Sequence, residues 1–248
     1  MHRAELHFHL LPGIDDGPET LDEAVELGRL AVADGTRRVT VTPHVRDLRR
    51  RGVLAELPAR VRAVQAALDA AGVPLAVEAG AELAHDDVAA LSDAELDAIA
   101  HGPAGHRWVL IEAPLFGGLD GFLDATAELR ARGLGTLIGH PERCAELMER
   151  PRALVRERAC GALAQVNASS LTGRHGADQR AWGLELVRSG LVDVIASDAH
   201  RPSRPPQLSA ALETLAGAGV PRESAEPMVG AVPLGLLDHG IAPLRRAA

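Results

Sequence analysis

The order of the secondary structure can be followed from residues 5–44, which read ELHFHLLPGIDDGPETLDEAVELGRLAVADGTRRVTVTPH. A short extended run at 5–9 precedes an amphipathic helix at 20–34, and a second extended run at 38–42 ends before Pro43. Thr20 and Glu23 form a capping box at the start of the helix, and Gly35 supplies the stop at its end. A helix that returns the chain between two strands predicts parallel strand pairing.

The same alternation of strand and helix continues along the chain. We expect further strands at 75–79, 108–112, 134–139, 162–167 and 192–197, and helices at about 56–71, 119–132, 142–160 and 175–189, with two short helices in 83–105 and a helical tail at about 207–240. Strands that alternate with helices, without a dinucleotide-type glycine fingerprint, favour an α/β barrel over a doubly wound sheet. We therefore expect one domain over residues 1–248, a distorted TIM-like (β/α)7 barrel.

The composition narrows the class of protein. Hydrophobic residues make up 46% and charged residues 24%, as in soluble globular proteins. The net charge of −8 argues against general nucleic-acid binding, because the phosphate backbone attracts Lys and Arg. No 18-residue apolar run predicts a membrane span, and the first residues contain no apolar signal region. Two cysteines do not make a disulfide framework, so we expect a cytoplasmic, reducing location.

Residue types that bind metal ions follow nearly every expected strand. They are His7, His9, Asp16, His44, Glu82, Glu112, His140, Asp198 and His200. Alternate residues of a strand point to the same face, so the imidazoles of His7 and His9 can reach one ion. In a parallel barrel the chemistry lies at the carboxyl ends of the strands. Imidazoles and carboxylates without cysteine favour a catalytic site for Zn, Mn or Fe(II).

Other polar residues fit this pattern less well. Asp15 stands beside Gly17, where a turn role and a role at the site are both open. Glu112 ends the apolar run at 108–111, where a buried charge needs a partner. The remaining histidines follow no such pattern, and we expect them at the surface; they are His2, His85, His101, His106, His175 and His239.

Two further segments could suggest other chemistry. Cys144 and Arg150 have the Cys-x5-Arg spacing of cysteine-based tyrosine phosphatases, but helix formers with two glutamates separate them, in place of a glycine-rich phosphate loop. We therefore expect Cys144 to be a packing residue. The run from Arg46 to Arg51 is either a solvated loop or a rim that attracts an acidic phosphorylated peptide, and both interpretations stay open.

These motifs resemble the PHP (polymerase and histidinol phosphatase) superfamily. Within it, they resemble most the CpsB/CapC family of bacterial tyrosine phosphatases from capsule and exopolysaccharide loci. The matching segments are HFHLLPGIDDG at 7–17, TPH at 42–44, GAE at 80–82, GHPER at 139–143 and SDAH at 197–200. They span residues 7–206 in the family's order. The loop from His200 to Arg204 is one residue shorter than the family pattern.

The resemblance implies a PHP fold with three divalent ions, usually manganese, with iron or zinc as alternatives. One ion would take His7, His9, Glu82 and Asp198, a second would share Glu82 and take Glu112 and His140, and a third would take Asp16, His44 and His200. Arg143 and Arg204 would hold the substrate phosphate.

We therefore expect a metal-dependent phosphomonoester hydrolase in which a metal-bridged hydroxide attacks phosphorus. The resemblance implies a phosphotyrosyl protein or peptide as substrate, with a bacterial tyrosine kinase as partner. A tyrosine phenolate, with a pKa of about 10, leaves with little proton donation, and the sequence shows no dedicated general acid. Two alternatives stay open: a phosphatase of histidinol phosphate or a nucleotide, and a metal-binding scaffold without catalysis.

Overall fold

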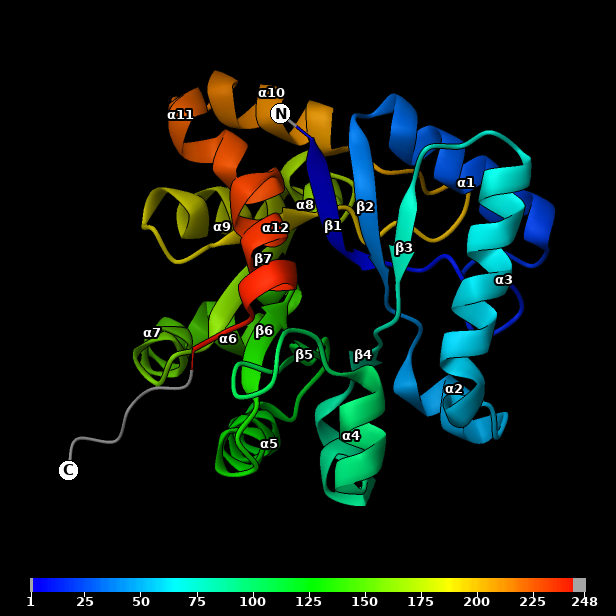
Figure 1. The fold of residues 1–248 in the computed structure, drawn as a ribbon. Helices are drawn as coiled ribbons and strands as arrows, with labels where there is room; N and C mark the ends of the chain where they lie inside the picture. Colours follow the sequence, from blue (N-terminus) through cyan, green and yellow to red (C-terminus); the bar gives the residue numbers. More distant parts are fainter. Residues whose placement is uncertain (1, 243–248) are drawn as a thin grey trace.

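Parallel β-strands form two sheets in the computed structural model, which describes residues 2–242 (Figure 1). The first sheet has the order β1-β2-β3, with β1 (Arg3–Phe8), β2 (Thr36–Val41) and β3 (Ala76–Glu78). The second has the order β4-β5-β6-β7-β8, with β4 (Glu82–Leu83), β5 (Trp108–Glu112), β6 (Gly135–Gly139), β7 (Leu163–Asn167) and β8 (Val194–Ala196). Single bridges join the two sheets at both sides, Phe8 with Ala199 and His44 with Glu82. The expected α/β class is confirmed, and the seams of this barrel-like arrangement are single bridges instead of continuous strand pairing.

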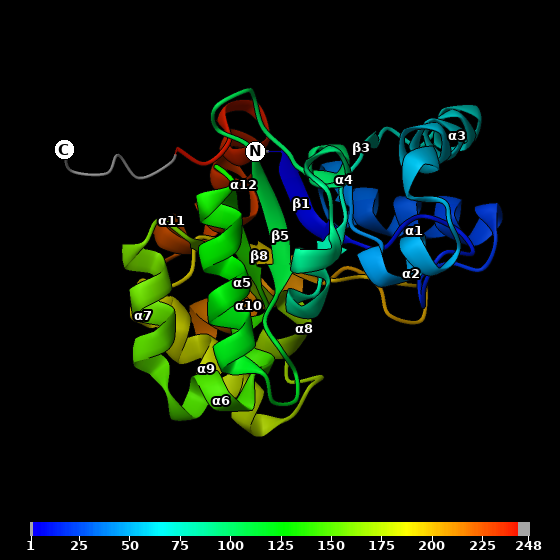
Figure 2. The ribbon, with the colours of Figure 1, turned by 90° about the horizontal axis from the view of Figure 1, so that it is seen from below.

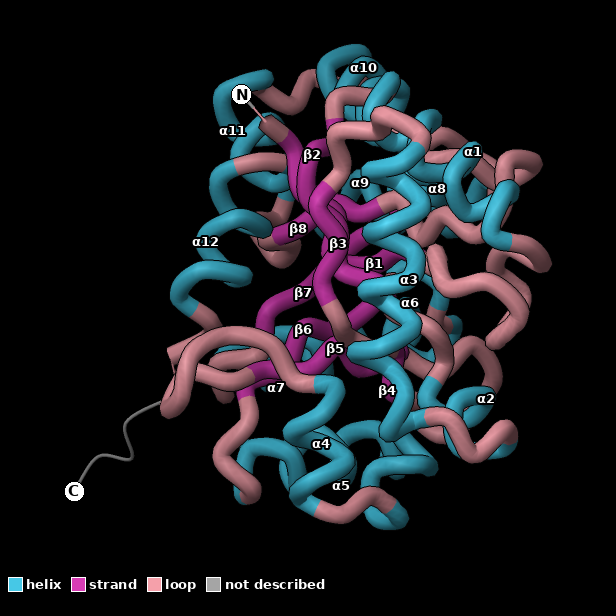
Figure 3. Tube along the Cα trace, turned by 45° about the vertical axis from the view of Figure 1, so that its right-hand side comes forward, coloured by secondary structure: helices cyan, strands magenta, loops and turns pink. Residues whose placement is uncertain are grey.

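Helices surround the strands on the outside (Figure 3). α1 (Leu21–Ala33) and α3 (Leu57–Ala70) accompany the first sheet, whereas α5 (Leu119–Ala131), α7 (Pro151–Ala159) and α9 (Ala177–Arg188) lie on the side of the second (Figure 2). The shorter helices are α2 (Val45–Arg50), α4 (Asp93–Ile99), α6 (Ala145–Glu149), α8 (Ala168–Leu171), α10 (Leu208–Gly217), α11 (Arg222–Ala225) and α12 (Ala231–His239). Short 3-10 segments are η1 (Leu54–Glu56), η2 (His85–Ala90), η3 (Pro141–Arg143) and η4 (Glu226–Val229).

The last helix packs against the amino-terminal ends of the strands. Leu236 and Leu237 of α12 lie in one apolar cluster with Ala4 and Trp108, and the Trp108 indole N–H donates to the Leu236 carbonyl at 3.0 Å. This end of the barrel is therefore filled, and the carboxyl ends of the strands are left to form the site. Within residues 2–242, no helix combines the length and apolar character needed to cross a membrane.

A β-bulge in β1 changes the direction of its side chains. The pairing of β1 with β2 shifts register between Glu5 and Phe8. Leu6 lies in the apolar cluster with Trp108, whereas Phe8 packs in the larger core beneath the helices. An extra residue in a strand re-aims the side chains that follow it. The bulge thus allows His7 to follow Leu6 and still point, together with His9, toward Glu82 and Asp198.

Several expected boundaries were wrong. The helix expected at 142–160 is divided into η3, α6 and α7, because Pro151 disfavours helical geometry at Arg150, whose φ and ψ are −123° and 56°. The arginine run at 46–51, expected as a loop, lies largely in helix α2. Glu82 belongs to a short strand of its own, β4, which was not among the seven expected strands. Local periodicity does not reveal so short a strand, because its pairing with β5 is tertiary.

His101, expected at the surface, is instead 7% exposed. Its ring packs against Trp108, with 4.7 Å between ring centroids, and a Cβ on Gly80 would lie only 2.1 Å from its Nε2 atom. Within the described residues, Nε2 has no hydrogen-bond partner. Burial, together with the nearby Arg107, lowers the pKa of His101 to about 4.

We expect His101 to make the protein less stable in mild acid. The unfolded chain takes up a proton near pH 6.5, but the native state takes it up only near pH 4. The free energy of unfolding should therefore fall by up to about 3 kcal/mol as the pH falls from 6.5 to 4. Urea unfolding at a series of pH values measures this dependence. His101→Gln should reduce the fall in unfolding free energy between pH 6.5 and 4, whereas the exposed control His2→Gln should leave it unchanged. Equal slopes in parent and His101→Gln would contradict the assignment.

Candidate metal centre

The nine side chains expected to bind metal meet at the carboxyl ends of the strands. Seven of them line one cavity of about 130 Å³, together with Leu115, Arg143 and Arg204. His7 and His9 are fully buried and contact the carboxylates of Glu82 and Asp198 at its base. The convergence expected from the sequence is therefore present in the structure.

Glu82 lies at the centre of the imidazoles. Its Oε2 atom is 3.2 Å from His7 Nε2, 3.3 Å from His9 Nε2 and 3.1 Å from His44 Nδ1, and its Oε1 atom is 3.1 Å from His140 Nε2. Burial disfavours the charged carboxylate, but the surrounding imidazoles outweigh burial and hold the pKa of Glu82 well below its ordinary value. Glu82 is therefore a buried anion that is shared by four histidines.

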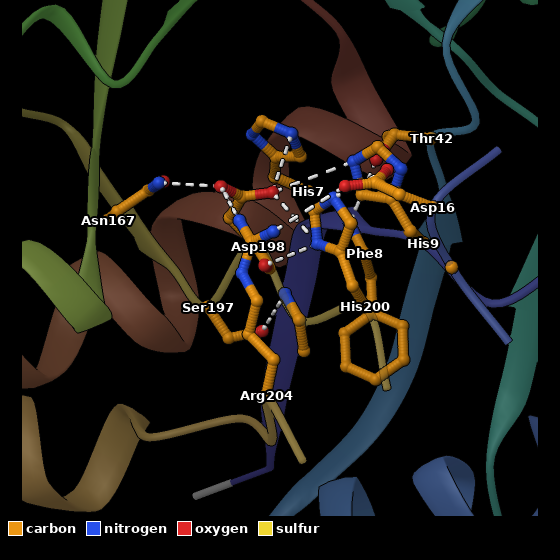
Figure 4. Close-up of polar contacts among 12 residues, drawn as sticks. His7, Phe8, His9, Asp16, Thr42, Asn167, Ser197, Asp198, His200 and Arg204 are labelled. Carbon is orange, nitrogen blue, oxygen red and sulfur yellow. Dashed lines mark hydrogen bonds and ion pairs between the residues drawn. The ribbon is translucent and has the colours of Figure 1, made fainter. Parts of the chain in front are cut away.

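Asp198 joins the imidazoles to two arginines, and its contacts with His7 and Arg204 can be followed in Figure 4. Its Oδ1 atom lies 3.3 Å from His7 Nε2 and 3.5 Å from His9 Nε2. Its Oδ2 atom accepts hydrogen bonds from Asn167 Nδ2 at 2.7 Å, Arg204 Nη2 at 3.0 Å and Arg143 Nη1 at 3.4 Å. One oxygen thus faces the imidazole cluster, and the other accepts from Asn167 and the two guanidinium groups.

Three imidazoles have their Nδ1 atoms held by acceptors. His9 Nδ1 is 2.8 Å from Asp15 Oδ2, and His200 Nδ1 is 2.8 Å from the Asp198 carbonyl oxygen. His7 Nδ1 is 3.0 Å from Gln165 Oε1. A proton on Nδ1 leaves the lone pair on Nε2, so each ring presents its lone pair to the centre. Metal-binding histidines are oriented in the same way by acceptors behind the ring.

The buried amides Gln165 and Asn167 set the tautomer of His7. The Asp198 carboxylate can only accept, so Asn167 must turn its Nδ2 toward it. The Asn167 Oδ1 then accepts from Gln165 Nε2 at 2.8 Å, which turns Gln165 Oε1 toward His7. The hydrogen-bond directions along this chain follow from one carboxylate, and they require His7 to be protonated on Nδ1.

His140 and Asp198 adopt left-handed backbone conformations, with φ of 36° and 52°. Among residues 2–242 they are the only non-glycine residues with positive φ. His140 directly follows β6, and Asp198 follows β8 after one residue, Ser197. Non-glycine residues rarely adopt this conformation, although Asp and His do so more often than most, and such residues cluster at functional sites. The strain here is located at two of the expected ligands.

The donor atoms of this cluster fit divalent cations. Within the described residues, His7 Nε2 and His9 Nε2 make no hydrogen bond, although carboxylate oxygens lie 3.2–3.5 Å away. Lone pairs that face carboxylates need a proton or a cation between them. Without a cation, the imidazoles must be protonated to face these carboxylates. Burial disfavours the protonated rings, but the adjacent carboxylates outweigh burial and raise the pKa of His9 to about 10 and that of His44 to about 12.

The possible ligand atoms form four overlapping groups, each within 4.8 Å. They are His9, Asp16, His44 and His200; His7, His9 and Asp198; His7, Glu82 and His140; and His44, Glu82 and Glu112. The first two resemble sets implied by the family. Glu112, however, groups with Glu82 and His44 instead of His140, so the sharing of ligands among ions stays a prediction.

Arg204 reaches the cavity despite the short loop before it. Its backbone N–H donates to the Arg201 carbonyl at 2.7 Å, which makes a tight turn, and its side chain contacts Asp198 and lies 3.8 Å from Asp16. The position of Arg204 is therefore compatible with the implied phosphate contact. The phosphate contacts of Arg204 and of Arg143 both stay predictions.

The arginine run on α2 is neutralised by its surroundings. Arg46 pairs with Asp86 at 2.9 Å, Arg50 with Asp47 at 2.7 Å, and Arg49 lies 3.9 Å from Glu95. Arg51 donates to the Ile14 carbonyl at 2.7 Å, which fastens the loop that contains Asp16. These partners favour a structural role over a free rim for acidic peptides.

Cys144 is buried, as expected for a packing residue. Burial raises the pKa of its thiol, which disfavours the nucleophilic thiolate. Arg150 instead pairs with Asp120 at 3.0 Å. The Cys-x5-Arg spacing therefore builds no phosphate loop.

Sequence reasoning missed the residues behind the imidazoles. Gln165 and Asn167 alternate in the buried strand β7, and this period-two pattern of polar residues was the available signal. Asp15, left open between two roles, holds His9 and also accepts from the His44 backbone N–H at 3.1 Å. His175, expected at the surface, is half-buried and bonds Ser169 at 2.9 Å; burial, with Arg143 and Arg204 nearby, lowers its pKa to about 4.

The family model for capsular polysaccharide synthesis, CpsB/CapC, matches residues 3–221. The chain belongs to the CpsB/CapC family. It is 31% identical over 211 residues to the tyrosine-protein phosphatase YwqE of Bacillus subtilis, and 28% identical over 198 residues to the putative tyrosine-protein phosphatase CapC of Staphylococcus aureus. Each match covers 79% of this chain and 76% of the relative.

Solved structures agree with this membership. A chain from the crystal structures of YwqE from Bacillus subtilis and CpsB from Streptococcus pneumoniae, described as unique metal-dependent tyrosine phosphatases, superposes with a TM-score of 0.80 at 27% identity. The match covers 98% of this chain and 100% of that chain. The phosphotriesterase homology protein from Escherichia coli, at 13% identity and a TM-score of 0.61, shares the fold.

Proposed function

We propose that this chain is a metal-dependent protein-tyrosine phosphatase of capsule or exopolysaccharide synthesis. Its family membership and the similarity to YwqE and CapC support this proposal. The observation that carries it is the arrangement around Asp198, where inward-facing imidazoles and two arginines meet at one carboxylate. If divalent ions bind to these imidazoles, a phosphate group at this point could contact the ions and the guanidinium groups together.

We further propose that the site holds three divalent ions, manganese being the expected one. The ligands would be the nine residues of the cluster, with Glu82 shared between ions. Bound divalent ions supply Lewis-acid charge and lower the pKa of water toward neutrality. Three such ions would outweigh the charge of the four carboxylates, so an acidic protein can present a local positive site to phosphate.

The protein's own residues would bind and orient the ester. Arg143 and Arg204 each use one N–H group on Asp198 and remain partly exposed at the cavity, at 21% and 25%. Their free N–H groups can bind phosphoryl oxygens as charge-assisted donors. Asp198 holds both guanidinium groups in place, which reduces the entropy lost when phosphate binds.

A phosphotyrosyl protein, specifically a bacterial tyrosine kinase in the cytoplasm, is the proposed physiological substrate. The phenolate leaving group needs little protonation, since its pKa is about 10. This matches a cavity in which cationic donors face the phosphate.

We expect the purified protein to hydrolyse p-nitrophenyl phosphate and phosphotyrosyl peptides when manganese is added. Removal of metal with a chelator should abolish turnover, and manganese should restore it. Elemental analysis of the same preparation should find metal in proportion to activity. Faster turnover on histidinol phosphate than on phosphotyrosyl peptide would indicate a small-molecule phosphatase, and inertness with every divalent ion would indicate a scaffold.

A further inference from the structure

Phe116 is an exposed aromatic residue that follows Leu115, one of the residues that line the cavity of the candidate site. The chain contains three phenylalanines and no tyrosine. Phe8 and Phe122 are fully buried, but Phe116 is 95% exposed. Exposure of a phenyl ring forgoes the hydrophobic stabilisation that the other two rings obtain. Folding of the described residues therefore does not account for the ring at this position.

The loop that carries Phe116 is anchored on both sides. It connects Glu112, which ends β5 at the cavity, with Leu119, the first residue of α5. On one side, Ala113 is buried and its N–H donates to the Gly139 carbonyl at 3.2 Å. On the other, Gly118 has φ of 80° and approaches His85 so closely that a Cβ would lie 2.9 Å from its Nε2. The two ends of the loop are thus held, and the Phe116 ring between them is exposed.

The candidate site needs an apolar edge if its substrate is an aryl phosphate. Of the ten described residues that line the cavity, nine are charged or imidazole side chains, and Leu115 alone is apolar. An adjoining cavity of about 210 Å³ shares His44, Glu82 and Glu112 and is also largely polar, with Arg46, Asp47 and Asp87. Neither wall favours an aromatic ring. Leu115 is the apolar side chain at this cavity, and the same loop carries the exposed ring of Phe116 at the next position.

We propose that Phe116, with Leu115, receives the aromatic ring of the substrate and so determines specificity for aryl over alkyl phosphates. This inference rests on the proposed phosphatase function and adds a residue to it. While the phosphate binds among the cations and arginines, the tyrosine ring would lie against Leu115 and pair with the Phe116 ring. Aromatic pairs of this kind add stabilisation beyond their buried area.

Phe116→Ala should reduce kcat/KM for p-nitrophenyl phosphate and phosphotyrosyl peptide by about threefold to tenfold. Its kcat/KM for the alkyl ester glycerol phosphate and its inhibition by inorganic phosphate should stay unchanged. Phe116→Trp should retain the aryl preference. Because the ring is exposed, these variants should unfold at the same temperature as the parent. The matched control is Val155→Ala on α7, which truncates another apolar side chain, 48% exposed. It should leave kcat/KM unchanged for both the aryl and the alkyl substrates.

A binding measurement separates recognition from turnover. Calorimetry on the manganese-loaded protein should show that Phe116→Ala lowers the affinity for phenylphosphonate by the same factor. The affinity for methylphosphonate should stay unchanged. The inference is overturned if Phe116→Ala lowers kcat/KM equally for aryl and alkyl substrates, or if Val155→Ala lowers kcat/KM for aryl substrates as much. It is also overturned if light scattering shows that Phe116→Ala only dissociates a dimer. A parent protein inert toward all phosphate esters would defeat the proposed function itself, whereas an active parent with an unchanged ratio would defeat only this inference.

Discussion

Replacing Asp198 with asparagine should lower kcat/KM for p-nitrophenyl phosphate by about a thousandfold or more. Asparagine tolerates the left-handed conformation that Asp198 adopts, so the backbone should be preserved. The change removes one negative charge from the centre and places an amide where His7 and His9 now face an oxygen. Arg143 and Arg204 then keep only a neutral amide oxygen as their common acceptor, in place of a carboxylate.

Metal content should fall together with activity in Asp198→Asn, as measured by elemental analysis of the purified variant. The control is Cys144→Ser, which should retain activity within about twofold per folded molecule, because the thiol packs in the core and does not line the cavity. If the cysteine variant loses activity while Asp198→Asn keeps it, the chemistry would belong to the Cys-x5-Arg segment after all.

Replacing Arg143 with alanine should lower kcat/KM by about a hundredfold or more, as expected when a preorganised donor to a developing anion is removed. The inhibition constant for inorganic phosphate should rise as well, because Arg143 is proposed to bind the phosphate before and during reaction. Arg143→Lys should recover part of the loss, since an ammonium group restores charge but cannot form a two-pronged contact.

Arg150→Ala is the matched control for Arg143, because Arg150 is half-exposed and pairs only with Asp120 in the described residues. It should leave both constants unchanged. An unchanged inhibition constant for inorganic phosphate in Arg143→Ala would show that this guanidinium contacts Asp198 but does not bind phosphate. The same measurement on Arg204→Ala would show whether the tight turn at Arg201 delivers a second phosphate donor.

Much of the site could be anticipated from the sequence. Strands end where Pro43 and the motif at 139–143 interrupt extended runs, and both are local features. Parallel strands deliver their ends to one face, so residues far apart in sequence could be placed together without coordinates. The class of fold and the positions of the imidazoles follow from these two rules.

Other features depended on long-range contacts. The division of 142–160 into separate helices could have been read from Pro151, but the burial of His101 against Trp108 could not. The roles of Gln165 and Asn167 were also hidden, because an amide acquires direction only from the groups it meets. The grouping of Glu112 with His44 depends on how β4 and β5 pair.

The sequence alone determined the alternation of strands and helices and the supply of imidazoles and carboxylates at the strand ends, because periodicity and turn residues act over a few positions. The tertiary structure alone decided the orientation of those side chains. Asp198 sets the hydrogen-bond directions through Asn167 and Gln165 to His7, and it does so across three strands. Hydrogen-bond direction is a property of a closed network of neighbours, and the chain must fold before those neighbours exist.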